Sequence, residues 1–229
     1  MRRRFVYILR SCTIAVMIPY LAVPIAVPQL TAYSAPYADQ ELPLQNVAVF
    51  SSGAIPDVPF YSQFRDIASP RWQKVGCGIT SLAMVIDFYK PDAVSVDALL
   101  RRGIAAGAYD EDGGWISQGL IRLSQAYGLH GTYDDLTKLD AASAFDAFKN
   151  ILKDGPVILS VHYQFNPKSM IPHLIVINGI AGDTVYYNDP ASKAAGEEIS
   201  VADFLKGWKK KIIVVRPAGE EGGRTLALQ

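Results

Sequence analysis

Cysteine, histidine and net charge are all scarce in this sequence of 229 residues, and each shortage excludes a class of protein. Two cysteines and three histidines do not form the clusters that hold a metal ion such as zinc. Twenty-two basic residues balance 22 acidic residues, so the chain lacks the positive surplus of a nucleic-acid-binding protein. We therefore expect no metal, no organic cofactor and no nucleic-acid partner.

Charge is also absent from a long stretch near the N-terminus. Four arginines lie in residues 1–10, and no other charged side chain comes before Asp39, which leaves 18 basic against 22 acidic residues elsewhere. The apolar residues 11–27 and the small residues 32–38 complete the pattern of a secretory signal peptide. An uncleaved membrane anchor is the alternative, although the apolar run is short for a span of about 20 residues and contains prolines. We predict export to the periplasm or the extracellular space, with residues 1–35 as signal peptide or anchor.

Composition and periodicity divide the rest of the chain. Proline, serine and glycine in residues 36–56 indicate a linker, and the polar, glycine-rich residues 218–229 indicate a disordered tail. Residues 57–217 are predicted to form one domain. Apolar residues at helical spacing dominate its first half, whereas strands rich in valine, isoleucine and tyrosine dominate its second half. Helices followed by an antiparallel sheet predict an α+β fold.

The clearest predicted helix covers residues 77–89, because it is apolar nearly all round, which is typical of a buried central helix. Further helices are expected at 95–102, 115–127, 140–153 and 200–208, and strands at 156–161, 173–180, 185–188 and 211–216. A hairpin turn at 181–183 joins the second and third strands.

Cys77 is the single cysteine that remains after removal of the predicted signal peptide. Such a cysteine in an exported protein is a reactive thiol, an intermolecular pairing site or a small buried hydrophobe. The position of Cys77 at the start of a helix favours the first interpretation, because helix N–H groups and the helix dipole stabilise a thiolate. Gly76 and Gly78 are expected to let a substrate backbone approach closely. Cys77 is therefore our candidate nucleophile.

His173 is the candidate base, because it opens a predicted strand beside the hairpin. One register pairs Ile180 with Thr184 across a three-residue turn. Asp189 then lies on the same face as His173, as its diagonal neighbour. A two-residue turn would place Asn188 on that face instead. Either side chain can accept a hydrogen bond from the imidazole and fix its tautomer.

An oxyanion formed at Cys77 would need hydrogen-bond donors, and the Cys77 backbone N–H with an upstream side-chain amide would supply them. Gln63 and Gln73 both qualify by residue type. The other histidines are expected to be surface or packing residues, with His130 in a loop and His162 one strand before His173.

Several motifs together resemble the double-glycine leader peptidases of the papain-like clan, which are bacterial bacteriocin-processing peptidases and their stand-alone relatives. The motifs are Val58–Gln63, Gly76–Val85, Gly155–Ile158, Pro172–Gly179 and Asn188–Pro190. The resemblance covers residues 57–216 and implies a papain-like fold with the Cys77 helix packed on an antiparallel sheet. It also implies Cys77 as nucleophile, His173 as base, Asp189 as the residue that orients His173, and Gln63 as oxyanion donor.

The expected function is hydrolysis of a peptide or amide bond through an acyl-thioester on Cys77, with a peptide or protein as substrate. The transporter-linked peptidases act in the cytoplasm, whereas this protein is predicted to be exported. A double-glycine leader is therefore not implied as its substrate. The alternatives are a catalytically silent module on the same fold that binds a peptide or an envelope partner, and a peptidyl transferase. Residues 164–171 are expected to form one wall of the cleft and to set specificity.

Overall fold

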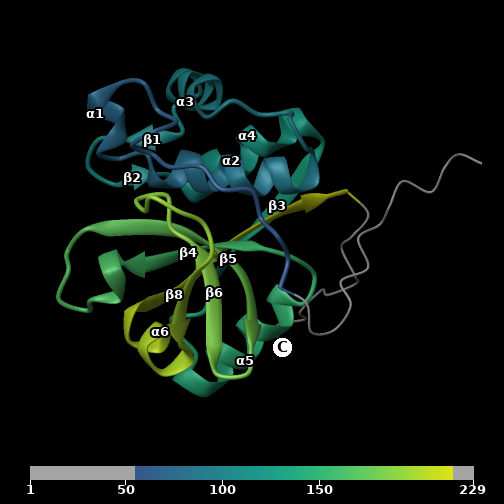
Figure 1. The fold of residues 1–229 in the computed structure, drawn as a ribbon, viewed down its shortest axis with the longest axis vertical. Coiled ribbons are helices and arrows are strands. Elements are labelled where there is room, and N and C mark those ends of the chain that lie inside the picture. Colours follow the sequence, from purple (N-terminus) through teal and green to yellow (C-terminus); the bar gives the residue numbers. More distant parts are fainter. Residues whose placement is uncertain (1–54, 219–229) are drawn as a thin grey trace, which may run out of the picture. The chain divides into compact units, whose positions relative to one another are not determined.

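A computed structural model describes residues 55–218 of the chain (Figure 1). The predicted signal peptide or anchor, the predicted linker up to residue 54 and the predicted tail from residue 219 lie outside these residues. In the described part, four helices cover one face of a six-stranded antiparallel sheet, and two further helices pack on its other face. The predicted α+β fold is therefore confirmed.

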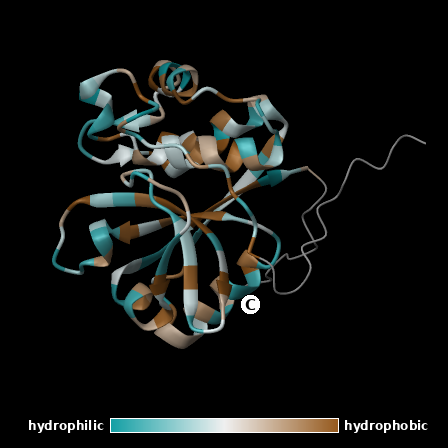
Figure 2. Cartoon of the chain, in the orientation of Figure 1, coloured by the Kyte–Doolittle hydropathy of each residue, from teal (hydrophilic) through white to brown (hydrophobic). Residues whose placement is uncertain are grey.

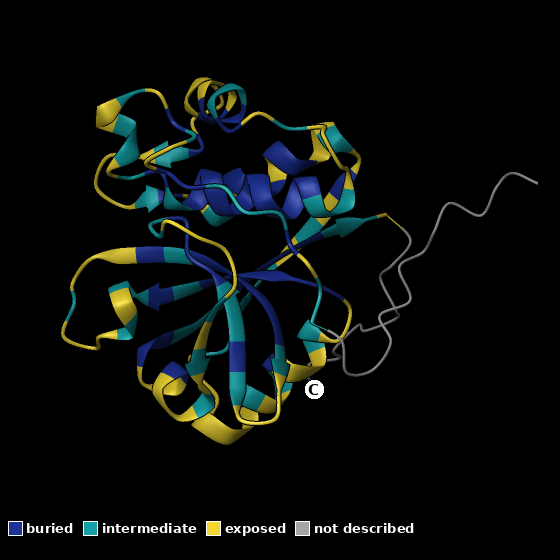
Figure 3. Ribbon diagram, viewed as in Figure 1, coloured by how far each residue is buried: buried dark blue, intermediate teal, exposed yellow. Residues whose placement is uncertain are grey.

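The helical layer is built around one buried helix. It consists of α1 (Pro70–Gln73), α2 (Cys77–Tyr89), α3 (Val96–Ala105) and α4 (Ser117–Ser124), with the short hairpin β1 (Tyr109–Asp110) and β2 (Gly114–Trp115) and the 3₁₀ turn Gln125–Tyr127. All residues of α2 from Gly78 to Asp87 are buried, as Figure 3 shows. This burial is the physical reason for the nearly uninterrupted apolar sequence of α2, which is also visible in Figure 2.

The sheet has the strand order β3-β8-β4-β5-β6-β7. Its strands are β3 (Leu129–Asp135), β4 (Val157–His162), β5 (Pro172–Ala181), β6 (Thr184–Asn188), β7 (Glu197–Ser200) and β8 (Trp208–Pro217). Successive residues of its central strands face opposite cores. Ile158 and Val176 pack with α2, whereas Leu159 and Ile175 pack on the other side. Both faces are buried, which explains why these strands are continuous apolar runs.

The second core lies under α5 (Ala141–Leu152) and α6 (Val201–Gly207). Phe148 of α5 and Phe204 of α6 stack at 5.6 Å between ring centroids and are fully buried. The carboxylate of Asp140 caps α5 and the hydroxyl of Ser200 caps α6. None of the described helices is long and apolar enough to cross a membrane.

Several elements differ from the predictions. The sequence predicts neither of the edge strands β3 and β7, and His130 lies in β3 and not in a loop. Both strands pair with one neighbour only, so they need few apolar residues and lack a strong sequence pattern. Trp115 belongs to β2, and the helix predicted from this residue begins at Ser117.

Candidate active site

A cleft of about 650 Å³ lies where the helical layer meets the sheet. Cys77 and Gln63 line it from the helical side, and His173 and Leu174 line it from the sheet. Three of the four predicted site residues therefore share one cleft, although 14 residues separate Gln63 from Cys77 and 96 separate Cys77 from His173. The fourth residue, Asp189, lies behind His173 and contacts it directly.

Cys77 is the first residue of α2, and its free thiol is partly exposed. The neighbouring glycines allow close packing inside the protein. A Cβ atom on Gly78 would lie 2.6 Å from Cγ of Trp115, and one on Gly76 would collide with Cδ1 of Ile67. The start of α2 therefore packs closely against other parts of the protein. That these glycines also let a substrate backbone approach stays a prediction.

His173 and Asp189 form a short, buried contact. The Nε2 atom of His173 lies 2.7 Å from Oδ1 of Asp189, and His173 is 4% exposed. The same carboxylate oxygen accepts a hydrogen bond of 2.7 Å from the backbone N–H of Ala191. The ring of Tyr163 meets the imidazole edge to face, with 5.2 Å between centroids. These contacts hold the imidazole in one orientation and leave Nδ1 as the ring nitrogen that is free of Asp189.

The electrostatics of this group favour an imidazolium. Burial opposes the charged form of His173, but the hydrogen bond to Asp189 and the interaction with the side chain of Cys77 outweigh it. Together they raise the pKa of His173 from its ordinary value of 6.5 to about 9. At neutral pH a positively charged His173 therefore lies beside the side chain of Cys77.

A β-bulge decides which residue accompanies His173. The β5–β6 turn contains two residues, because Ala181 pairs with Thr184, so the predicted pairing of Ile180 with Thr184 is wrong. A regular ladder from this turn would bring Asn188 to the face of His173. The register instead shifts at Asn178, so that Ile177 pairs with Tyr187 and Val176 pairs with Asn188. This shift restores the alignment that places Asp189 on the face of His173.

Asn188, the alternative partner, has a structural role. It is fully buried, and its Nδ2 donates a hydrogen bond of 3.0 Å to the carbonyl of Val58. Its Oδ1 accepts a hydrogen bond of 2.9 Å from the N–H of Gly196. These two bonds tie the incoming chain and the segment before β7 to the end of β6.

The two candidate glutamines occupy different places. Gln63 is 4% exposed and lines the cleft, and its backbone N–H donates to the carbonyl of Pro190 at 2.8 Å. Its Nε2 donates to the carbonyl of Gln73 at 2.7 Å, which leaves one amide hydrogen uncommitted. The side chain of Gln73 donates to the carbonyls of Ile67 and Phe64 and does not line the cleft. Of the two, only Gln63 lines the cleft, and its role as an oxyanion donor stays a prediction.

The remaining histidines lie outside the cleft. His130 is exposed on β3, and Nδ1 of His162 lies 2.9 Å from the carbonyl of Ser169. Among residues 55–218, no group of three or more histidine, cysteine, aspartate or glutamate side chains could hold a metal ion. Around Cys77, the cleft therefore brings together the imidazole of His173 and the amide of Gln63, with the carboxylate of Asp189 behind His173.

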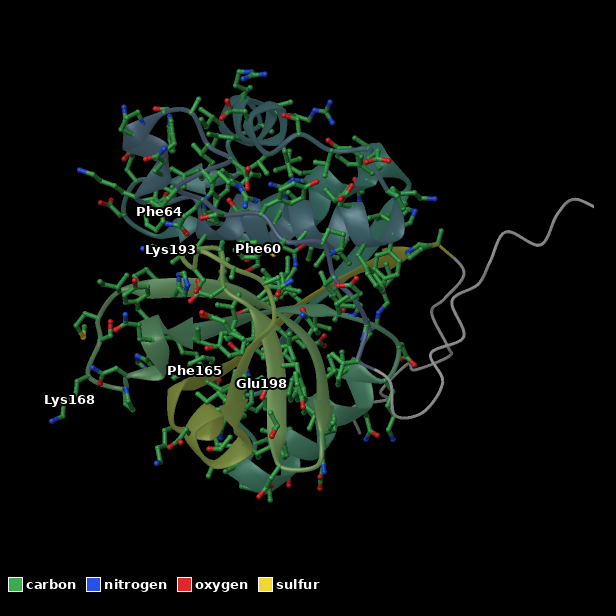
Figure 4. The ribbon with its side chains drawn as sticks, in the orientation of Figure 1. Phe60, Phe64, Phe165, Lys168, Lys193 and Glu198 are labelled. Atoms are coloured by element: carbon green, nitrogen blue, oxygen red, sulfur yellow. The ribbon has the colours of Figure 1, made fainter. Side chains whose placement is uncertain are left out.

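The loop before His173 contributes to the cleft at its two ends only. Tyr163, in the 3₁₀ turn Tyr163–Phe165, and Ile171 line the cleft. Phe165 packs against Tyr187 and Phe204 under α6, and Lys168 points away from the domain in Figure 4. Of residues 164–171, which were predicted to form a wall of the cleft, Ile171 lines it. That this loop sets specificity stays a prediction.

Residues 55–211 match the peptidase C39-like family. The chain belongs to this family. No curated protein matches the chain. Among solved structures, it is similar to a double glycine motif protease from an AMS/PCAT transporter, in complex with the leader peptide, with 22% identity and a TM-score of 0.51 over 73% of this chain and 96% of that one.

A second similar structure is a C39-like peptidase from Bacillus anthracis, with 18% identity and a TM-score of 0.50 over 70% of this chain and 95% of that one. At these identities the likeness shows the fold, and it agrees with the family. The helices packed on a six-stranded antiparallel sheet are those of C39 peptidase structures. The roles of Cys77, His173, Asp189 and Gln63 stay predictions.

Several cleft residues were not singled out by the sequence. Tyr163 and the pair Lys209 and Lys211 all line the cleft. The run Lys209–Lys211 is visible in the sequence, but three consecutive lysines usually indicate a solvated strand or loop. Only the irregular course of β8 turns two of them into the cleft.

Proposed function

We propose that the protein is an exported cysteine peptidase that hydrolyses a peptide or other amide bond. The observation that carries this proposal is the buried 2.7 Å contact between His173 and Asp189 beside Cys77 in one cleft. A peptide substrate is supported by the similar double glycine motif protease, whose structure contains a leader peptide.

In the proposed reaction, the Cys77 thiolate attacks the carbonyl carbon, and the C=O electron pair moves onto the oxygen. The Cys77 backbone N–H and the Gln63 amide donate hydrogen bonds to this oxyanion. As the C–N bond breaks, the His173 imidazolium gives its proton to the leaving amine, and an acyl-thioester remains on Cys77. Neutral His173 then takes a proton from water, whose oxygen attacks the thioester. The acid product leaves, and the thiolate and imidazolium are restored.

The role of Asp189 in this scheme is to position His173 and to stabilise its charge. Its carboxylate fixes the tautomer by accepting a hydrogen bond from Nε2–H, which leaves Nδ1 for proton exchange with sulfur and substrate. The hydrogen bond from the N–H of Ala191 helps to hold the Asp189 carboxylate in this position.

Cleavage of a varied peptide library by the protein, followed by mass spectrometry of the products, tests the proposal. Wild-type protein should generate new termini, and Cys77→Ala and His173→Ala should lose this activity. His162→Ala is the matched control, because His162 lies outside the cleft and its loss should leave cleavage unchanged. Full activity in Cys77→Ala would refute the thiol mechanism.

The same library distinguishes the two alternative functions. Peptides that bind tightly to the wild-type protein without cleavage would identify a catalytically silent binding module. A product longer than its parent peptide would identify a peptidyl transferase. Export is tested separately by the intact mass and cell fraction of the full chain in a bacterial host. We expect loss of about the first 35 residues or retention in the membrane, and an uncleaved cytoplasmic protein would refute export.

A further inference from the structure

Strand β8 is irregular at the point where it passes the cleft. Ser160 of β4 pairs with Lys211, but the next residue, Val161, pairs with Trp208. Lys209 and Lys210 are therefore two additional residues in β8, and Lys210 has a left-handed backbone with φ of +56°. A lysine in this conformation is strained, and bulges near functional sites commonly redirect side chains.

The irregularity separates the three consecutive lysines. Lys209 and Lys211 line the cleft together with Cys77 and His173. Lys210 turns elsewhere, and its Nζ donates a hydrogen bond of 2.7 Å to the carbonyl of Leu139. Two lysine side chains two positions apart thus reach the cavity, with Ser160 on the neighbouring strand beside Lys211.

Neither cleft lysine has an ion-pair partner within residues 55–218. The carboxylate opposite Lys211 in the strand pairing is Asp135, which feels the charge of Lys211 without forming an ion pair. Its Oδ1 accepts from both the N–H and the hydroxyl of Thr137. Burial and the charge of Lys211 lower the pKa of Lys209. The two ammonium groups therefore repel each other in a partly desolvated place, and a bound anion would relieve this repulsion.

The acidic side chains of the cleft come from the helical layer. Glu111 and Asp112, in the β1–β2 turn, also line it, and Glu111 is bound to Arg71 at 2.7 Å. The cleft thus has negative groups on the β1–β2 turn and positive groups on β8. A peptide that crosses the cleft would meet negative charges on the helical side and positive charges on the sheet side. Such an arrangement can favour peptides with one charge pattern bound in one direction.

We infer that Lys209 and Lys211, with the hydroxyl of Ser160, form a subsite for a carboxylate of the substrate. This inference rests on the proposed function, because it names a chemical requirement of the peptide that the cleft would bind. The carboxylate has two possible sources, an aspartate or glutamate side chain near the scissile bond or the C-terminal carboxylate of the peptide. Either source would supply one carboxylate that binds to both ammonium groups.

Alkylation of Cys77 tests the subsite without any knowledge of the substrate. Iodoacetate and iodoacetamide react with the same thiol and differ in one carboxylate, so the ratio of their rates reports the attraction of a carboxylate into the cleft. We expect Lys209→Gln and Lys211→Gln each to lower this ratio by about threefold at low salt. Changes in thiolate population affect both reagents equally and cancel in the ratio. Lys210→Gln is the matched control and should leave the ratio unchanged, because its side chain is bound to Leu139 outside the cleft.

Binding of synthetic peptides to the Cys77→Ala protein distinguishes the two carboxylate sources. Three forms of each library peptide are compared: one with an internal glutamate and an amidated C-terminus, one with glutamine and a free C-terminus, and one with glutamine and an amidated C-terminus. Tighter binding of the first form would identify a glutamate side chain as the source, and tighter binding of the second form would identify the C-terminal carboxylate. The double variant Lys209→Gln with Lys211→Gln should abolish this difference in affinity. Equal binding of all three forms, or an alkylation ratio that is the same in all variants, would overturn the subsite.

The proposed function and the subsite can fail separately in these measurements. Cleavage without any preference for a carboxylate would leave the peptidase standing and overturn the subsite. A lysine-dependent carboxylate preference in binding, without cleavage by the wild-type protein, would support the subsite and refute the hydrolase.

Discussion

The two walls of the cleft are built in different ways. The helical wall is regular, because α2 is a continuous buried helix whose start packs tightly on Ile67 and Trp115. The sheet wall depends on two irregularities, the bulge at Asn178 in β5 and the two additional residues in β8. The regular wall fixes one thiol by close packing. The irregular wall selects which of several polar side chains reach the cleft.

The largest effect should come from the sheet wall, through Asp189→Asn. This change removes the carboxylate that raises the pKa of His173, so the imidazole loses its charge near neutral pH. We expect alkylation of Cys77 at pH 6 and peptide cleavage to fall by about 100-fold or more. The measurement is the rate of iodoacetamide modification against pH, read by intact mass. Asp154→Asn, on the protein surface, is the control. An unchanged pH profile of Cys77 modification in Asp189→Asn would show that Asp189 does not influence the thiol.

Close packing in the helical wall predicts the second effect. Gly78→Ala would place a Cβ atom 2.6 to 2.8 Å from the side chain of Trp115, and we expect a loss of about 1–3 kcal/mol in the free energy of unfolding. Gly113→Ala, in the turn that also lines the cleft, meets only Asp110 at 3.5 Å and should change stability little. Thermal denaturation of both variants checks this, and equal melting temperatures would show that the start of α2 tolerates a side chain.

A pH dependence of stability should follow from His173 in the sheet wall. Folded protein holds the His173 proton up to a pKa of about 9, whereas the unfolded chain releases it near the ordinary value of 6.5. This contribution to stability is therefore complete below pH 6.5 and is lost as the pH rises towards 9. Urea denaturation at pH 6 and pH 9 should show this decrease in wild-type protein and a smaller one in Asp189→Asn. A decrease of the same size in both would assign it to another group.

The smallest effect concerns the loop before β5. Gln164 is exposed and has a left-handed backbone with φ of +54°, which is costly for any residue except glycine. Gln164→Gly should raise the free energy of unfolding by up to about 1 kcal/mol. Lys168→Gly, in the same exposed loop but without a positive φ, should instead lower it slightly. If Gln164→Gly is also destabilising, the left-handed turn is not strained.

Much of the site could be predicted from local sequence. The apolar run after Cys77 has the period of a buried helix, so the thiol at the start of α2 follows from periodicity alone. His173 at the start of a valine- and isoleucine-rich strand is predicted in the same way. The edge strands β3 and β7 could not be found, because a strand with one partner and an exposed face has no distinctive pattern.

The sequence by itself determined the fold class, the helix that begins at Cys77 and the short set of candidate partners, since each of these depends on residues that are neighbours in the chain. Only the tertiary structure decided between Asp189 and Asn188, and between Gln63 and Gln73. A single bulged residue reverses the face of every side chain beyond it, and although Gly179 in β5 is compatible with a bulge, it does not specify the register. The same reason applies to β8, where an irregular ladder and not the run of three lysines brings two positive charges into the cleft.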